Sequence, residues 1–329
     1  MQLPDSVTRV ADGIFQVQIP LPFALKIVNC YLLEGGDGWT VLDTGLHRPE
    51  AEAVWNEAFA ALGITPASLT QIVLTHVHPD HYGMAGWFQQ WSGAPVYASK
   101  REAEGAVRIW VQGGERLPVI YEQMAQVGAP PDVADAVVGG IESTRQMTFP
   151  HPTHVEYIAY GAQMRMGGRD FTAIHAPGHS DGLLMFYDPV DKLILSGDHV
   201  LMKITPNIGL WTDTEPQPLA RFMESLRGLR DMDVRLGLPG HKALITAWGE
   251  RIDQLLHHHD ERLEKCVEAV GMGSDGVTAY DVARVLFDFG RLSAHEMRFA
   301  LVETLAHLDY LVARGMIEHA EGTAWRYHR

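Results

Sequence analysis

The stretch from Thr75 to His81, which reads Thr-His-Val-His-Pro-Asp-His, constrains this chain more than any other. It places three imidazoles and one carboxylate directly after an apolar run. Polar groups are costly to bury without partners, and imidazole and carboxylate are common ligands of zinc and related metals. In an extended chain His76 and His78 point the same way. Asp80 and His81 must then come from a turn, which the proline before them helps to start. The two pairs of side chains therefore predict two metal ions rather than one.

Length and charge narrow the class of protein. With 329 residues the chain can form one large domain and a small one, or two ordinary domains. Its formal net charge of −15 argues against a general binder of nucleic acid or of anionic membranes, because such proteins need a cationic surface. The expected ligand is a small molecule.

The cysteines and the N-terminal residues bear on the compartment. Cys30 and Cys266 are far apart and form no CxxC pair, which excludes a disulfide scaffold and a thiolate metal site. The first residues lack the basic and apolar segments of a signal peptide, and no run of apolar residues is long enough to span a membrane. We therefore expect a cytoplasmic protein with no membrane contact.

The chain up to about residue 247 alternates strand-like and helix-like segments, which is typical of a layered α/β domain. Strand patterns lie within residues 7–45, 71–74, 154–195 and 234–238, and helix patterns lie within 50–62, 83–91 and 216–229. Residues 100–150 differ, because they contain helix-like pieces broken by glycine and proline. This insert is either a packing element or a lid over a site.

Further candidate ligands follow other strands. His179, Asp198 and His241 each come directly after a glycine at the end of a strand-like run, where a sharp turn could direct a short side chain across the strand ends. One such residue alone is usually an ordinary turn residue. Together with the cluster at His76, the pattern predicts that all these side chains meet at one edge.

In the order and spacing of these residues the sequence resembles the metallo-β-lactamase superfamily of metal-dependent hydrolases, over roughly residues 7–245. The resemblance implies a four-layer αββα sandwich with its site at one edge of the two sheets. It also implies ligand roles: His76, His78 and His179 for the first metal, Asp80, His81 and His241 for the second, Asp198 between them, and Asp43 outside the ligands, accepting a hydrogen bond from a ligand or a loop amide.

The resemblance further implies hydrolysis by a metal-bound hydroxide, with two divalent ions that are zinc in the first instance, although iron or manganese would suit these ligands. Asp80 is the candidate proton donor. An aspartate at position 198 resembles the glyoxalase II, lactonase, phosphodiesterase and nuclease branches more than true β-lactamases, so we expect at most weak β-lactamase activity. The predicted substrate is a small to medium ester, thioester or lactone. The alternatives are a phosphodiesterase or ribonuclease of this fold, and a binding module without activity.

From residue 248 the pattern becomes helical, so the chain divides into a predicted catalytic domain, 1–247, and a C-terminal domain, 248–329. Three helices closed by a hairpin resemble the winged-helix tail found in the lactamase-β-like-2 branch of the superfamily. Residues 251–329 hold nine basic and thirteen acidic side chains, which favours a structural role or a homodimer contact over nucleic-acid binding. The run His257 to His259 is no metal site, because successive helical residues face different directions.

Overall fold

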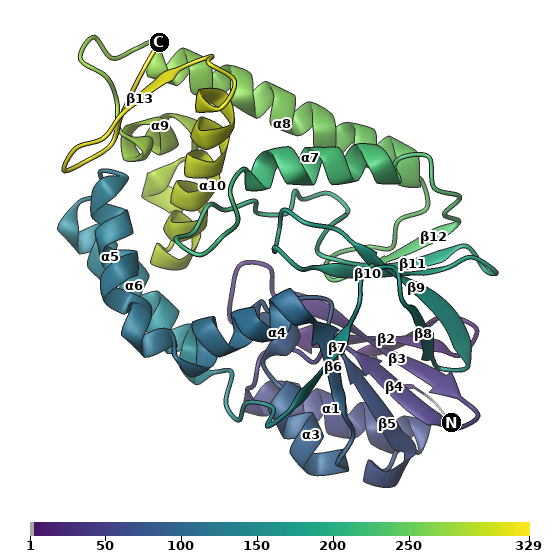
Figure 1. The fold of residues 1–329 in the computed structure, drawn as a ribbon. Coiled ribbons are helices and arrows are strands. Elements are labelled where there is room, and N and C mark those ends of the chain that lie inside the picture. The colour runs from purple at the N-terminus through teal and green to yellow at the C-terminus, as the bar shows by residue number, and fades with distance from the viewer. Residues whose placement is uncertain (1–2) are drawn as a thin grey trace.

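Two β-sheets and their helices make up most of the chain, and a group of C-terminal helices packs at one end (Figure 1). The structure is a computed structural model that describes residues 3–329; residues 1 and 2, the start of the predicted 1–247 domain and of the segment considered for a signal peptide, lie outside the described part. No helix in the described part is both long and apolar enough to cross a membrane.

The first sheet has seven strands in chain order. They are β1 (Val7–Ala11), β2 (Ile14–Pro20), β3 (Ile27–Gly35), β4 (Gly38–Leu42), β5 (Leu69–Val73), β6 (Val96–Ser99) and β7 (Val155–Ile158). Strands β1 to β4 form an antiparallel meander, whereas β4 to β7 run parallel. Parallel neighbours need long crossover connections. Helices α1 (Pro49–Leu62) and α3 (Ala85–Ser92) supply two of them.

The second sheet has five strands in the order β12-β11-β10-β9-β8. These are β8 (Gln163–Met166), β9 (Arg169–His175), β10 (Leu184–Asp188), β11 (Leu193–Gly197) and β12 (Leu236–Pro239). Strands β11 and β12 are parallel and are connected through helix α7 (Pro218–Leu229). All other neighbours in this sheet are antiparallel.

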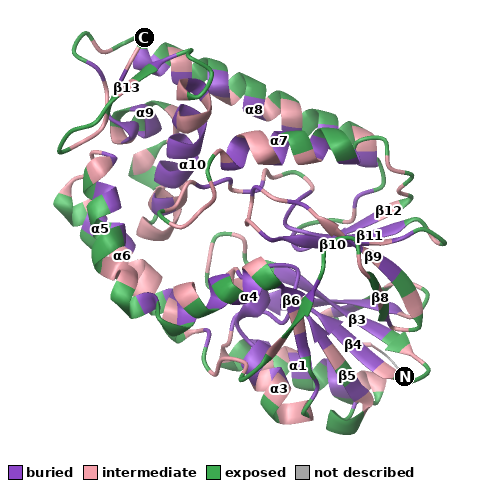
Figure 2. Cartoon of the chain, in the orientation of Figure 1, coloured by how far each residue is buried: buried purple, intermediate pink, exposed green. Residues whose placement is uncertain are grey.

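Alternation along the strands shows how the layers pack, because successive side chains of a strand point to opposite faces. On β3, Leu32 packs with the residues of α1 and α3, whereas Leu33 packs between the two sheets. On β11, Leu195 packs between the sheets and Ile194 packs toward α7. Figure 2 shows the buried strands lying between helices whose outer faces are exposed. The predicted αββα sandwich is confirmed.

The insert predicted at residues 100–150 is helical. It contains α4 (Lys100–Ala106), α5 (Leu117–Gln126) and α6 (Pro131–Gln146), with short helical turns at 107–111 and 113–116. Met124 of α5 and Val137 of α6 are buried in the same apolar cluster as Leu301 of the C-terminal region. The far end of the insert is therefore part of a packed core.

The C-terminal region contains α8 (Trp248–Val270), α9 (Ala279–Leu286) and α10 (Ala294–Val312), followed by the hairpin of β13 (Glu318–Ala320) and β14 (Arg326–His328). Thr278 caps α9, and its hydroxyl accepts a hydrogen bond from the Asp281 amide at 3.1 Å. On α8 the three successive histidines separate: His257 is exposed and His259 is fully buried. Helices closed by a hairpin agree with the predicted pattern, while the likeness to a winged helix stays a prediction.

Two glycine-to-alanine changes test how tightly α3 packs behind the histidine motif. A Cβ at Gly86 of α3 would collide with the backbone of Pro150 and His151, whereas a Cβ at Gly139 of α6 would meet nothing within 4 Å. We expect Gly86→Ala to lower the free energy of unfolding by about 1–3 kcal/mol. Gly139→Ala should raise it by about 0.5–1 kcal/mol, because alanine favours helix. Urea unfolding followed by circular dichroism measures both, and equal effects of the two changes would contradict the packing described.

Candidate metal centre

The predicted ligands all lie at the C-terminal ends of strands. His76 and His78 are in the loop after β5, and the next residues form the short helix α2 (Pro79–Tyr82), which carries Asp80 and His81. In the second sheet β9, β11 and β12 point the same way, because β10 is antiparallel to both β9 and β11. The segments that follow these three strands therefore start at one edge, and they carry His179, Asp198 and His241 respectively.

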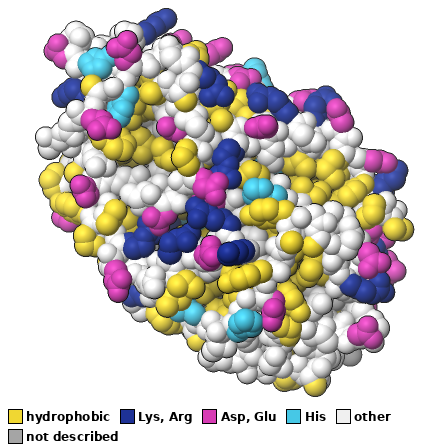
Figure 3. Space-filling model, viewed as in Figure 1, with side chains coloured by type: hydrophobic (Ala, Val, Ile, Leu, Met, Phe, Trp, Pro, Cys, Tyr) yellow, Lys and Arg dark blue, Asp and Glu magenta, His cyan; other side chains and the backbone are white. Residues whose placement is uncertain are grey.

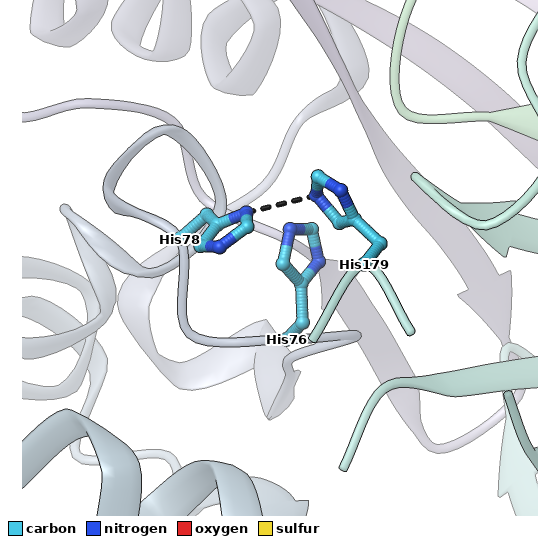
Figure 4. A group of neighbouring side chains, drawn as sticks. All are labelled: His76, His78 and His179. Carbon is cyan, nitrogen blue, oxygen red and sulfur yellow. Dashed lines mark hydrogen bonds between the residues drawn. The ribbon is translucent and has the colours of Figure 1, made fainter. Parts of the chain in front are cut away.

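Seven predicted side chains meet at this edge. They form three overlapping groups whose ligand atoms lie within 4.8 Å of one another: His76, His78 and His179; His76, His81 and Asp198; and Asp80, His81 and His241. Figure 4 shows the first group, in which His78 Nδ1 and His179 Nε2 lie 2.8 Å apart.

Asp198 lies between the two sets of histidines. Its Oδ1 is 3.4 Å from His81 Nε2, and its Oδ2 is 3.3 Å from His241 Nε2 and 3.7 Å from His179 Nε2. Its carboxylate is thus within reach of ligands from both predicted metal positions, where a bridging group would have to be.

The atoms that face the interior of the cluster fit a metal centre. In residues 3–329, His76 Nε2, His81 Nε2, His241 Nε2 and Asp198 Oδ1 are buried and have no hydrogen-bond partner. Buried polar atoms are normally paired, since leaving one unpaired costs about 1–3 kcal/mol. Metal ions bound by these nitrogens and oxygens would satisfy them together.

The opposite ring nitrogens are held by the protein. His179 Nδ1 donates to the carbonyl of Asn207 at 2.8 Å, and His241 Nδ1 donates to the carbonyl of Ile27, also at 2.8 Å. In a neutral imidazole, donation through Nδ1 leaves the lone pair on Nε2, so these contacts select the tautomer that a metal requires.

Asp43 organises the first strand end from outside the cluster. Its carboxylate accepts from the Thr75 amide, the Thr75 hydroxyl and His81 Nδ1, each at 2.8 Å. Because the Thr75 hydroxyl donates to Asp43, it can only accept from His76 Nδ1, 2.9 Å away. Asp43 therefore orients His81 directly and His76 through Thr75.

The electrostatics divide the cluster into two halves. Burial and the neighbouring imidazoles lower the pKa of His76, and burial with the His179 charge lowers that of His78 to about 3. Burial also opposes charge on His241, but Asp198 and Asp80 outweigh it and raise its pKa to about 10. Without metal, His76 and His78 are therefore neutral and can bind a cation. In the other group, a protonated His241 offsets the negative charge of Asp80 and Asp198.

Glu102 of α4 is a residue of this site that the sequence analysis missed. It is buried, its Oε2 accepts from the Val77 amide at 2.7 Å, and its Oε1 accepts from the Ser180 hydroxyl at 2.5 Å and the Gly182 amide at 2.7 Å. Val77 lies between two predicted ligands and Ser180 follows a third. One carboxylate thus joins the loops of the two sheets.

A local pattern explains why Glu102 was overlooked. Ser99 and Glu102 have the spacing of a helix capping box, which usually predicts a surface helix terminus. Ser99 does cap α4, since its hydroxyl accepts from the Glu102 amide at 3.1 Å. The glutamate carboxylate, however, turns inward to the loops rather than back to the helix end.

The glycines before the ligands have two different roles. Gly178 and Gly197 have φ angles of 130° and 50°, as expected for sharp turns that L-residues rarely adopt. Gly240 has no such angle. A Cβ there would collide with the Asp198 carboxylate and lie 2.7 Å from His81 Cε1, so this glycine is needed for space rather than for a turn.

His199, next to Asp198, is a packing residue rather than a group at the site rim. It is fully buried and its Nε2 lies 2.9 Å from the Ser225 hydroxyl. Burial lowers its pKa to about 3, so it stays neutral.

A change at Glu102 tests its joining role. In Glu102→Gln an amide NH₂ replaces one acceptor oxygen and faces backbone or hydroxyl donors, so we expect zinc affinity to fall about 10- to 100-fold and stability by about 1–3 kcal/mol. Competition with a chromophoric chelator measures the affinity, and thermal unfolding measures the stability. Glu104→Gln, an exposed glutamate on the same helix, is the control. Unchanged zinc affinity in Glu102→Gln would contradict this role.

Two protein-family models match this chain. A model described as "Metallo-beta-lactamase superfamily" matches residues 24–241, and one described as "Metallo-beta-lactamase-like, C-terminal domain" matches residues 263–329. The second match covers the C-terminal third of α8 and all of α9, α10 and the hairpin.

Individual proteins agree with these matches. The crystal structure of the metallo-beta-lactamase family protein TTHA1429 from Thermus thermophilus is similar with a TM-score of 0.87 and 31% identity, covering 98% of this chain and 100% of that one. Probable metallo-hydrolase YqjP of Bacillus subtilis is 24% identical over 93% of this chain and 94% of its own length. An atrochrysone carboxyl ACP thioesterase of Aspergillus fumigatus is 23% identical over 80% of this chain and 49% of its own length. This chain belongs to the metallo-β-lactamase superfamily.

Proposed function

We propose that this protein is a hydrolase with two metal ions, zinc in the first instance, that cleaves a small to medium ester, thioester or lactone. The observation that carries the proposal is the set of buried, unpartnered ligand atoms on His76, His81, His241 and Asp198. All seven predicted ligand positions are filled, which argues against a binding module that has lost its chemistry. The similarity to an ACP thioesterase favours a thioester carbonyl as the point of attack.

Each residue would have a defined position in such a centre. His76, His78 and His179 would hold one ion, Asp80, His81 and His241 the other, and Asp198 would contact both. When bound, a pair of such ions supplies a water of lowered pKa and an electrophile for the carbonyl oxygen. Asp43 and Glu102 would keep the ligand loops in place while substrate binds and leaves.

Asp80 is the residue best placed to carry a proton. Burial opposes its ionisation, but the charges of His81 and His241 outweigh burial and hold its pKa well below the usual range. The side chain keeps 15% of its surface exposed, more than that of Asp198 at 8%. Because Asp80 is the more solvent-accessible of these two carboxylates, it would be the one to pass a proton to the leaving group.

Phosphodiester hydrolysis is the weaker candidate because the charges do not favour a polyanion. The net charge is −15, and basic side chains such as Arg101 and Arg221 form ion pairs with Asp181. On the face shown in Figure 3, Lys and Arg form a small group beside acidic side chains rather than a continuous stripe. A nucleic acid binder would need such a stripe.

Removal of Asp198 tests the proposal. We expect wild-type protein to bind two equivalents of metal and to hydrolyse at least one member of a panel of esters, thioesters and lactones after loading with zinc, manganese or iron. Asp198→Ala should lose at least one equivalent and 10²-fold or more of the activity, because it removes the carboxylate placed between the ions. Plasma mass spectrometry counts the metal, and a pH indicator follows the acid released from all three substrate classes.

Two controls make the result specific. Asp198→Asn keeps the shape of the side chain and should match Asp198→Ala in activity while folding normally by circular dichroism. Asp231→Ala changes a carboxylate with an 86% exposed side chain and should behave as wild type. Metal-loaded wild-type protein that is inert on carbonyl substrates but cleaves RNA would replace this proposal by the nuclease alternative.

A further inference from the structure

Helix α10 of the C-terminal region reaches the metal centre at two points. Its His295 stacks on Phe23, with ring centroids 4.1 Å apart and planes inclined by 7°. Phe23 lies in the loop between β2 and β3, and β3 begins at Ile27, whose carbonyl holds His241. The first turn of α10 therefore packs on the segment that supports one predicted ligand.

The next turn contacts the support of a second ligand. The side-chain amide of Asn207 donates to the Phe299 carbonyl at 3.2 Å and to Glu303 Oε2 at 2.9 Å. The backbone carbonyl of the same Asn207 holds His179. Position 298 lies on α10 between the residues that make these two contacts.

Arg298, at this position, is a buried cation that is only partly satisfied. Only 6% of its surface is exposed, its Nε has no hydrogen-bond acceptor, and no carboxylate within residues 3–329 forms an ion pair with it. Its guanidinium lies 4.5 Å from the centroid of the Phe299 ring. Burial lowers its pKa to about 10, with the charge of Asp80 acting in the opposite direction, so it stays cationic at neutral pH.

A second buried arginine in the C-terminal region has the hydrogen bonds that Arg298 lacks. Arg251 of α8 is 9% exposed, but it donates to the carbonyls of Leu201 at 2.6 Å and Ile204 at 2.7 Å. A buried charge that is neither paired nor hydrogen-bonded is strongly destabilising. The Nε of Arg298 therefore carries a desolvation cost in this state, which a hydrogen bond to an incoming anion would reduce.

We propose that Arg298 binds an anionic group of the substrate, a carboxylate or a phosphate, while the scissile carbonyl lies at the metal centre. The inference rests on the proposed hydrolase function and narrows its substrate class to acyl compounds that carry a negative charge. A planar guanidinium matches the two oxygens of such an anion and holds it in a fixed direction. In a chain of net charge −15, a local cation of this kind is needed to attract an anionic substrate.

Three thioesters with the same scissile bond test the proposal and separate the two sources of charge. The first joins a neutral acyl chain to N-acetylcysteamine, the second carries a terminal carboxylate on that acyl chain, and the third joins the neutral chain to phosphopantetheine. Wild-type protein should show a lower KM for the second or the third than for the first. Arg298→Gln should raise that KM about 10- to 100-fold and leave the KM of the neutral thioester within about twofold.

Matched variants distinguish this role from a structural one. Arg298→Lys keeps the charge but loses the planar fork, so it should recover only part of the effect. Arg291→Gln changes an arginine with an 87% exposed side chain just before α10 and should leave all three KM values unchanged. Equal KM increases for charged and neutral thioesters in Arg298→Gln, or no increase at all, would overturn the proposal.

A binding measurement separates this inference from the hydrolase function. Calorimetric titration of metal-free wild-type protein with glutarate and with phosphopantetheine should give salt-sensitive binding that Arg298→Gln weakens and Arg291→Gln does not. Such binding without any thioester hydrolysis would refute the proposed reaction while keeping the anion site. If wild-type protein hydrolyses charged and neutral thioesters equally well, the anion site is refuted and the hydrolase function is kept. This comparison needs only wild-type protein, so it holds even if Arg298→Gln fails to fold.

Discussion

The rest of this structure depends on a few buried atoms without hydrogen-bond partners. They are the Nε2 atoms of His76, His81 and His241 and one carboxylate oxygen of Asp198. Imidazole rings facing one another in a dry interior repel whenever more than one is charged, and they lose hydrogen bonds when neutral. The protein fixes their far sides. Asp43 holds His81 directly and His76 through Thr75, and the Ile27 carbonyl holds His241. Rings held in this way through one nitrogen present the other nitrogen in a fixed direction, as binding of a metal ion requires.

The sandwich fold holds the ligand side chains in position, because they follow directly on the ends of strands rather than lying in long flexible loops. The His76 loop belongs to the first sheet, and His179, Asp198 and His241 belong to the second. The two sheets must therefore keep their relative position within a fraction of an ångström for the ligand sets to form. Glu102 contributes directly to this, since its two oxygens accept hydrogen bonds from loops of both sheets.

The sequence was informative where chemistry is local and less so where it depends on tertiary contacts. The cluster at His76 to His81 and the glycine-preceded ligands could be recognised because their residue types are unusual at strand ends. The layered fold followed from strand and helix periodicity. Glu102 could not be recognised, because a glutamate three residues after a serine at a helix start predicts a cap, and only the folded chain shows it facing another loop. Gly240 was expected for the wrong reason, since crowding by Asp198 is invisible along the chain.

The same limit applies to the C-terminal region, whose charge balance favoured a structural role or a homodimer contact over nucleic-acid binding. Nothing in residues 294–312 taken alone indicates proximity to His179, more than a hundred positions earlier. In the structure one asparagine, Asn207, joins the two, since its backbone holds the ligand and its side chain holds α10. A displacement of α10 would therefore be transmitted to a ligand as well as to Arg298. The C-terminal helices therefore support the candidate metal centre, and the position of a predicted ligand depends on both parts of the chain.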